Sequence, residues 1–145
     1  MQIQEIDRSE FESSVSISRQ PWLEAASRRV RELAEYPLSR ILIAVDEGRT
    51  RAVLGLDLYW SLDGLLSRAT IRVLEVDPEY DRRGIGARLI RFAEGIARVK
   101  GCSRVHVASG LERWGNGRCW LSLGYDGRGP ELAKDITPFL RRGCV

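Results

Sequence analysis

The sequence predicts an α/β (α+β) fold with a mixed, mostly antiparallel central sheet, one parallel strand-helix-strand unit and flanking helices. Two observations lead to this fold. Strand-like segments follow one another as a hairpin run between residues 40 and 76, and strands then alternate with helices. Residues 71–108 have the pattern of a strand, a helix and a strand, and this connection makes the two strands parallel or nearly so.

The N-terminal part of the chain predicts one strand and a broken helical region. Residues 2–6 alternate polar and apolar side chains, as a half-buried strand does. Helical spacing follows from about Arg8 to Tyr36, and Pro21 marks a break within it.

Three strands are expected next. The apolar run 41–45 predicts a buried strand, residues 46–49 predict a turn, and residues 52–60 predict the hairpin partner. A second turn is expected near Asp63 and Gly64. A further strand over 69–76 ends before Pro78, because proline cannot continue the hydrogen-bonded ladder.

The C-terminal half opens with the most regular helical pattern. Residues 84–100 predict a helix that ends at Gly101, with an apolar stripe formed by Ile85, Leu89, Phe92, Ile96 and Val99. Residues 105–108 predict a short strand, and residues 118–123 predict a short helix closed by Gly124. The tail 125–145 shows no clear pattern.

Length and composition limit the class of protein. The 145 residues fit one domain, 1–145, and 43% hydrophobic with 30% charged residues is a globular balance. No apolar run approaches the ~20 residues of a membrane span, and the N-terminus has no signal-peptide core, so we expect a soluble, cytoplasmic protein. Three cysteines without CxxC spacing indicate neither a disulfide framework nor a zinc site, and no metal is expected.

The segment before the regular helix has the composition of a diphosphate site. Arg82 and Arg83 oppose the helix dipole unless an anion lies between them. Gly84 and Gly86 remove side chains where amides without intrahelical partners can approach a phosphate. A dinucleotide loop fits worse, because GxGxxG requires glycine where Leu89 stands, and no GK[ST] follows as in a P-loop.

At this point the sequence resembles the GNAT superfamily of acyl-CoA-dependent N-acetyltransferases. Residues 76–80 and 84–90, VDPEY and GIGARLI, are similar to that family's V-x-P-x-x-(R/Q)-x-x-G-x-G/A motif and its helix. Residues 109–113 and 121–125, SGLER and LSLGY, resemble the family's later S-G-x-x-R and L-G-Y segments. The resemblance covers roughly residues 40–126.

The resemblance implies an N-acetyltransferase with acetyl-CoA as co-substrate and a direct transfer to an amine in a ternary complex. The backbone of Leu74, Glu75 and Val76 would then pair with the pantetheine arm. The strand after the helix would separate from its neighbour and open a slot for the thioester. The residues implied to hold the pyrophosphate are Arg82, Arg83, Gly84, Ile85, Gly86 and Ala87.

Two positions depart from the family pattern. Asp81 stands at the basic or glutamine position, so Arg82 or Arg83 must supply the positive charge. Trp120 stands where a tyrosine is proposed to protonate the departing thiolate. An indole N–H donates a hydrogen bond but does not titrate near neutral pH, so Trp120 is a catalytic candidate as a donor only.

A general base is still required, because an alkylamine with a pKa of about 10 is mostly protonated at neutral pH. Glu75 is the first candidate, followed by Asp57, Asp63 and Glu112, and the alternative for each is a solvated or ion-paired carboxylate. Trp22, Tyr59 and Trp60 are candidates either for an acceptor pocket or for the core. Cys102 and His106 are interpreted as structural, because four strand residues separate them by about 13 Å.

Two other functions remain open. A non-catalytic acyl-CoA-binding module would keep the pyrophosphate loop and lack the proton-transfer groups, as Trp120 allows. Nucleic-acid binding is less consistent with the chain, because the net charge of +3 is small and dispersed. The acceptor amine is not identified, and both a monomer and a homodimer remain open.

Overall fold

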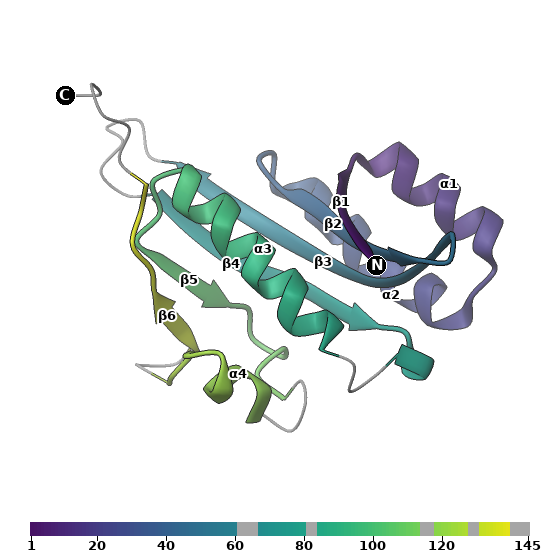
Figure 1. Cartoon of the computed structure of the whole chain (residues 1–145). Helices are drawn as coiled ribbons and strands as arrows, with labels where there is room; N and C mark the ends of the chain where they lie inside the picture. The colour runs from purple at the N-terminus through teal and green to yellow at the C-terminus, as the bar shows by residue number, and fades with distance from the viewer. Residues whose placement is uncertain (61–66, 81–83, 114–117, 128–130, 140–145) are drawn as a thin grey trace.

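Six strands form one sheet in the order β1-β2-β3-β4-β5-β6 (Figure 1). The computed structural model describes residues 1–60, 67–80, 84–113, 118–127 and 131–139. Neighbouring strands are antiparallel except β4 and β5, which are parallel. The mixed sheet with one parallel pair is therefore confirmed. The strands are β1 (Gln2–Ile6), β2 (Arg40–Asp46), β3 (Arg49–Trp60), β4 (Ser67–Val76), β5 (Arg104–Val107) and β6 (Ala133–Asp135).

The helical region near the N-terminus divides at Pro21, as predicted. Asp7 caps the first helix, since its carboxylate accepts from the Glu10 amide at 2.8 Å while the Glu10 side chain accepts from the Asp7 amide. Pro21 occupies the first turn of the second helix, where its missing N–H costs nothing. The helices are α1 (Arg8–Ser18), α2 (Pro21–Glu32), η1 (Leu33–Glu35), η2 (Pro78–Tyr80), α3 (Ile85–Val99) and α4 (Arg118–Ser122).

Helices cover both faces of the sheet, so the strands are buried from two sides. Successive residues of β2 show the alternation, because Ile41 and Ile43 pack with α1 and α2 while Leu42 and Ala44 pack with α3. Figure 1 shows α3 lying over one face, with α1 and α2 on the other side of the sheet. We call these the α3 face and the α2 face.

The buried side of α3 differs from the predicted stripe. Ile85 and Leu89 are buried as predicted, but Phe92 and Val99 are 42% and 59% exposed. The small residues Gly86, Ala93 and Ala97 allow the helix axis to lie close to the sheet, and this close contact decides which side is buried. The buried residues of α3 are Ile85, Gly86, Leu89, Ile90, Ala93, Glu94 and Ala97.

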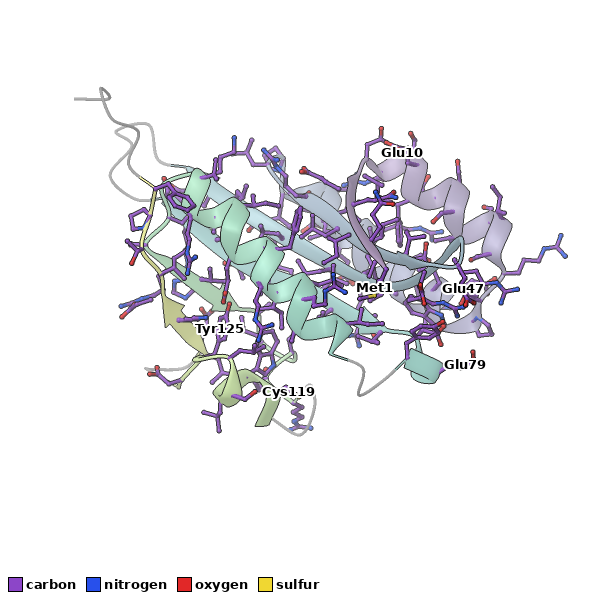
Figure 2. The ribbon with its side chains drawn as sticks, in the orientation of Figure 1. Met1, Glu10, Glu47, Glu79, Cys119 and Tyr125 are labelled. Atoms are coloured by element: carbon purple, nitrogen blue, oxygen red, sulfur yellow. The ribbon has the colours of Figure 1, made fainter. Side chains whose placement is uncertain are left out.

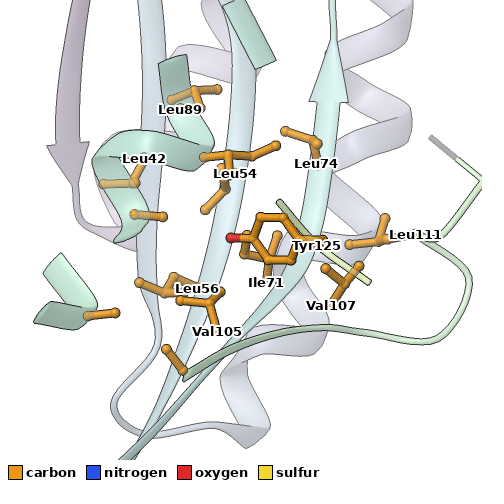
Figure 3. Packing of buried hydrophobic residues seen from close by; sticks show 14 of the residues in the cluster. Leu42, Leu54, Leu56, Ile71, Leu74, Leu89, Val105, Val107, Leu111 and Tyr125 are labelled. Carbon is orange, nitrogen blue, oxygen red and sulfur yellow. The ribbon is translucent and has the colours of Figure 1, made fainter. Parts of the chain in front are cut away.

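Strand β6 has no counterpart in the sequence prediction, which left the tail unassigned. It pairs with β5 and contributes Lys134, whose ammonium lies 3.1 Å from the buried carboxylate of Glu94 on α3. The Tyr125 hydroxyl donates to the same carboxylate at 2.8 Å. Figure 3 shows the Tyr125 ring among the aliphatic side chains of β3, β4 and β5. This polar contact joins the tail to α3. The predicted turn at Asp63 and Gly64 lies outside the described residues.

Candidate functional site

Strands β4 and β5 separate after three residue pairs, and the last of these joins Ile71 and Val107. The Ala108 amide still donates to the Ile71 carbonyl at 2.9 Å. Beyond Ile71, β4 continues to Val76 and pairs with β3, while no described strand pairs with its other edge. The backbone of residues 74–76 therefore borders an open edge of the sheet. We call the opening between β4 and β5 beyond Ile71 the fork. The predicted separation of these strands is present.

A β-bulge in β4 lies at the fork. Leu56 of β3 faces Ile71 and Gly55 faces Val73, so Arg72 is an extra residue without a partner in the register. As a result Arg72 and Val73 both lie on the α2 face. The Arg72 guanidinium contacts Asp57 at 3.1 Å and stacks over the Tyr36 ring at 4.1 Å, while Val73 belongs to the α2-face core.

Opposite the bulge, Gly55 lets the Leu33 side chain approach the strand more closely than any residue with a Cβ would permit. A Cβ at this position would lie 2.6 Å from the Leu33 side chain and 3.1 Å from Val73. The glycine thus allows η1 to pack directly on the bulged part of the sheet.

The start of α3 has the features of an anion site. Gly84 precedes the helix with φ of +75°, and a Cβ built there meets nothing within 4 Å. The first turn of α3 carries no acidic residue, in contrast to α1 with its Asp7 cap. The positive end of the helix dipole is therefore not neutralised by its own first turn. Arg82 and Arg83 lie outside the described residues.

A buried ion pair anchors the segment that leads into α3. Arg51 of β3 and Asp77 lie 3.0 Å apart, with side chains only 7% and 5% exposed. The Asp77 carboxylate also accepts from the Glu79 amide at 3.0 Å, and the Arg51 guanidinium lies 4.1 Å from the Tyr80 ring centre. Figure 2 shows Glu47 and Glu79 at this same end of the sheet. Sequence reasoning did not find Arg51, because no spacing pattern connects residues that are 26 positions apart.

On the α2 face, two hollows border the fork. A cavity of about 1000 Å³ lies over β3, β4 and β5, with Asp57, Thr70 and His106 side by side across its floor. A smaller hollow of about 420 Å³ extends toward α2. Tyr36, Arg72, Ala108 and Ser109 line both, so they meet where the two strands separate.

Of the aromatic candidates for an acceptor pocket, the structure places one in the larger cavity. Tyr59 is exposed and lines it. Trp22 instead packs against the α2-face core and donates to the Gln20 side chain at 3.0 Å. The Trp60 side chain lies outside the described residues.

His106 also lines this cavity, although sequence reasoning assigned it a purely structural role. The alternation of buried Val105 and Val107 was the signal that placed His106 on the opposite face. Its Nδ1 lies 3.2 Å from the Arg68 guanidinium and 3.5 Å from the Glu131 carboxylate. Burial, with the nearby Arg68 charge, lowers the pKa of His106 below its usual 6.5, so the ring is neutral at neutral pH.

With this geometry in place, comparison with known proteins identifies the family. The acetyltransferase (GNAT) family model matches residues 1–125. The chain belongs to the GNAT acetyltransferase family. No protein with curated annotation matches the sequence.

Solved structures confirm the GNAT fold. An aminoglycoside 6'-N-acetyltransferase complexed with coenzyme A has a TM-score of 0.68 at 17% identity, over 97% of this chain and 100% of that chain. The aminoglycoside 6'-N-acetyltransferase from Enterococcus faecium has a TM-score of 0.65 at 18% identity, over 97% and 100%. IAA acetyltransferase from Bacillus cereus has a TM-score of 0.69 at 18% identity, over 93% and 99%. At these identities the likeness shows the shared fold.

The two catalytic candidates occupy different environments in this GNAT fold. Trp120 is fully buried on the α3 face, where its Nε1 donates to the Leu111 carbonyl at 2.7 Å and its ring meets Tyr125 edge-on at 5.2 Å. Its catalytic role remains a prediction, and this placement favours a structural role. Glu75 lies partly exposed at the open edge of β4, with its carboxylate 2.7 Å from Arg29 of α2. Its role as a base also remains a prediction.

The described residues contain no cluster of three or more potential metal ligands. No helix within the described ranges combines the length and apolar composition needed to cross a bilayer.

Proposed function

We propose that this GNAT protein, acting as a single acyl-CoA N-acyltransferase-like domain, transfers an acetyl group from acetyl-CoA to an amine by direct attack in a ternary complex. The observation that carries the proposal is the fork between β4 and β5, which lies between the cavity on the α2 face and the start of α3. A cofactor bound at α3 and an amine in the cavity would meet at the fork. We place the reaction in the cytoplasm, consistent with cysteines that show no disulfide spacing.

The cofactor residues follow the open edge and the helix start. Backbone groups of Leu74, Glu75 and Val76 would bind the pantetheine arm, and a backbone N–H of this segment would polarise the thioester carbonyl. The first amides of α3, which have no partners within the helix, favour the pyrophosphate, and solved neighbours of this fold include coenzyme A complexes. The proposed pyrophosphate residues are Arg82, Arg83, Gly84, Ile85, Gly86 and Ala87.

The transfer balances without a further reactant. The amine nitrogen forms a bond to the acetyl carbon, the carbon–sulfur bond breaks, and the thiolate leaves as coenzyme A. Most of the rate enhancement would come from placing a neutral amine against the carbonyl. Glu75, directly or through water, would accept the amine proton, and its contact with Arg29 orients the carboxylate.

A steady-state assay tests this function. Purified protein is given acetyl-CoA and a panel of amines, thiol release is followed, and products are identified by mass spectrometry. We expect a product heavier by one acetyl group, and Glu75→Gln should lower kcat by roughly 10²-fold or more. Glu12→Gln, which changes an exposed carboxylate of α1 that is not a candidate base, is the control. Acetyl-CoA binding without any product would instead support the non-catalytic binding module.

A further inference from the structure

The larger cavity on the α2 face has an unusual distribution of charge for a site that takes an amine. Its described lining residues include three arginines, Arg68, Arg72 and Arg104, and two carboxylates, Asp57 and Glu131. Both carboxylates already contact an arginine, since Asp57 lies 3.1 Å from Arg72 and Glu131 lies 3.0 Å from Arg68. His106 adds no charge at neutral pH, because burial lowers its pKa. The described lining residues therefore carry one more positive than negative charge, and Asp135, which is not among them, pairs with Arg104 at 2.8 Å.

Two of the arginines are neighbours on adjacent strands. Ala69 of β4 faces Val105 of β5, and Arg68 and Arg104 each precede one of these residues by one position. Both side chains line the same cavity. Like charges side by side on neighbouring strands destabilise a sheet, and here Glu131 and Asp135 each offset one of the two charges, so a ligand carboxylate between the arginines would take over part of this role.

Both arginines are accessible to such an anion. Arg68 and Arg104 are 52% and 47% exposed, and their partners Glu131 and Asp135 are also exposed. Exposed ion pairs contribute little to stability, so an incoming carboxylate can replace or join these partners. The pair of Arg72 with Asp57 is more buried and is not available in this way.

The distance to the fork sets a minimum size for the acceptor. Arg68 lies three residues before Ile71, where β4 and β5 separate, and six residues before Leu74, so strand geometry gives about 10 Å to the near end of the fork and about 20 Å to Leu74. An extended tripeptide has about the shorter of these two lengths between its amine and its terminal carboxylate.

We propose that the acceptor is a zwitterion, with a carboxylate at least about 10 Å from the reacting amine, and that Arg68 and Arg104 bind this carboxylate. The inference rests on the proposed function, because the position of the amine is set by the acetyl group. Polycationic amines fit this net positive cavity poorly. Neighbours with the same fold include aminoglycoside acetyltransferases, so charge rather than fold would set the acceptor class here.

Paired ligands test the inference independently of turnover. Triglycine and triglycine amide carry the same amine and differ in the terminal charge. Binding of each to the coenzyme A-loaded protein is measured by calorimetry, for the wild type, the Arg68→Gln/Arg104→Gln variant and the control Arg28→Gln, an exposed arginine of α2. We expect the wild type and the control to bind triglycine roughly fivefold or more tightly than the amide. In the double variant this ratio should fall to about one or below.

Three results would overturn the inference: equal affinities in the wild type, a preference that survives in the double variant, or no binding of either peptide at millimolar concentration. A preserved preference for triglycine without acetylation of any amine would contradict the proposed function and leave the anion site intact.

Discussion

The buried pair of Arg51 and Asp77 gives a prediction whose size follows from the structure. Both side chains are almost fully buried with 3.0 Å between charged atoms, so removing either one leaves the other charge without its partner in the interior. Such a loss costs about 3–5 kcal/mol, a large part of the ~5–15 kcal/mol that holds a domain folded. We expect Arg51→Met and Asp77→Ala each to lower the free energy of unfolding by about 3 kcal/mol or more.

The double variant Arg51→Met/Asp77→Ala measures the interaction between the two charges apart from their contacts with other residues. It removes both charges together, so its loss of stability should be smaller than the sum of the single losses by about 2 kcal/mol. Urea unfolding at neutral pH and 25 °C, followed by tryptophan fluorescence, measures each free energy.

A second ion pair of the same length provides the control. Arg40 and Glu5 are also 3.0 Å apart, but their side chains are 32% and 40% exposed. Replacing Arg40 with Met or Glu5 with Ala should therefore cost no more than about 1 kcal/mol. The reasoning fails if the buried and exposed pairs lose similar stability, or if the Arg51 and Asp77 losses simply add.

Three further predictions concern groups outside the cofactor loop. Tyr125→Phe should lower the free energy of unfolding by about 1–3 kcal/mol in the same assay, because the buried Glu94 carboxylate loses its 2.8 Å hydrogen bond; an unchanged value would contradict this. Burial and the Arg68 charge hold the pKa of His106 below 6.5, so the unfolded chain takes up this proton first and the wild type loses stability as pH falls through that window. The free energy of unfolding of the wild type minus that of His106→Asn, measured by urea unfolding at each pH, should therefore decrease from about pH 7.5 to pH 5. An increase of this quantity over the same range would refute the reasoning. Burial raises the pKa of the Cys102 thiol, so in a Cys119→Ser/Cys144→Ser background Cys102 should react with DTNB only after unfolding, and rapid labelling of the native protein would count against its burial.

The sequence was informative where local chemistry determines structure. Proline at the first turn of α2, the apolar run of β2 and glycine before α3 act within a few residues, and each predicted its element correctly. The match to residues 1–125 confirms the family that residues 76–90 indicated.

Contacts between distant residues could not be predicted in the same way. Phe92 fits the apolar period of α3 but is exposed, because the small residues Ala93 and Ala97 fit closer to the sheet. Strand β6 has only three residues, and its position depends on pairing with β5 and on the contact between Lys134 and Glu94. These interactions exist only once the sheet has formed.

In the candidate site too, features set by neighbouring residues were predictable and features set by distant residues were not. The start of α3 was recognisable from Gly84 and Gly86, whereas the cavity on the α2 face depends on the register that aligns Asp57, Thr70 and His106. The bulge at Arg72 also cannot be recognised from one strand, because it is defined only against β3.

The central claim is that the start of α3 binds the pyrophosphate of acetyl-CoA, and two isosteric variants of Gly84 test it most directly. A side chain has room at this position, and asparagine and aspartate are the residues that best tolerate a positive φ, so both variants should fold. Calorimetric titration with acetyl-CoA should show binding to the wild type, a modest loss in Gly84→Asn, and an affinity at least about tenfold lower still in Gly84→Asp, where a carboxylate faces the phosphates. Equal affinities of the two variants for acetyl-CoA would contradict the claim.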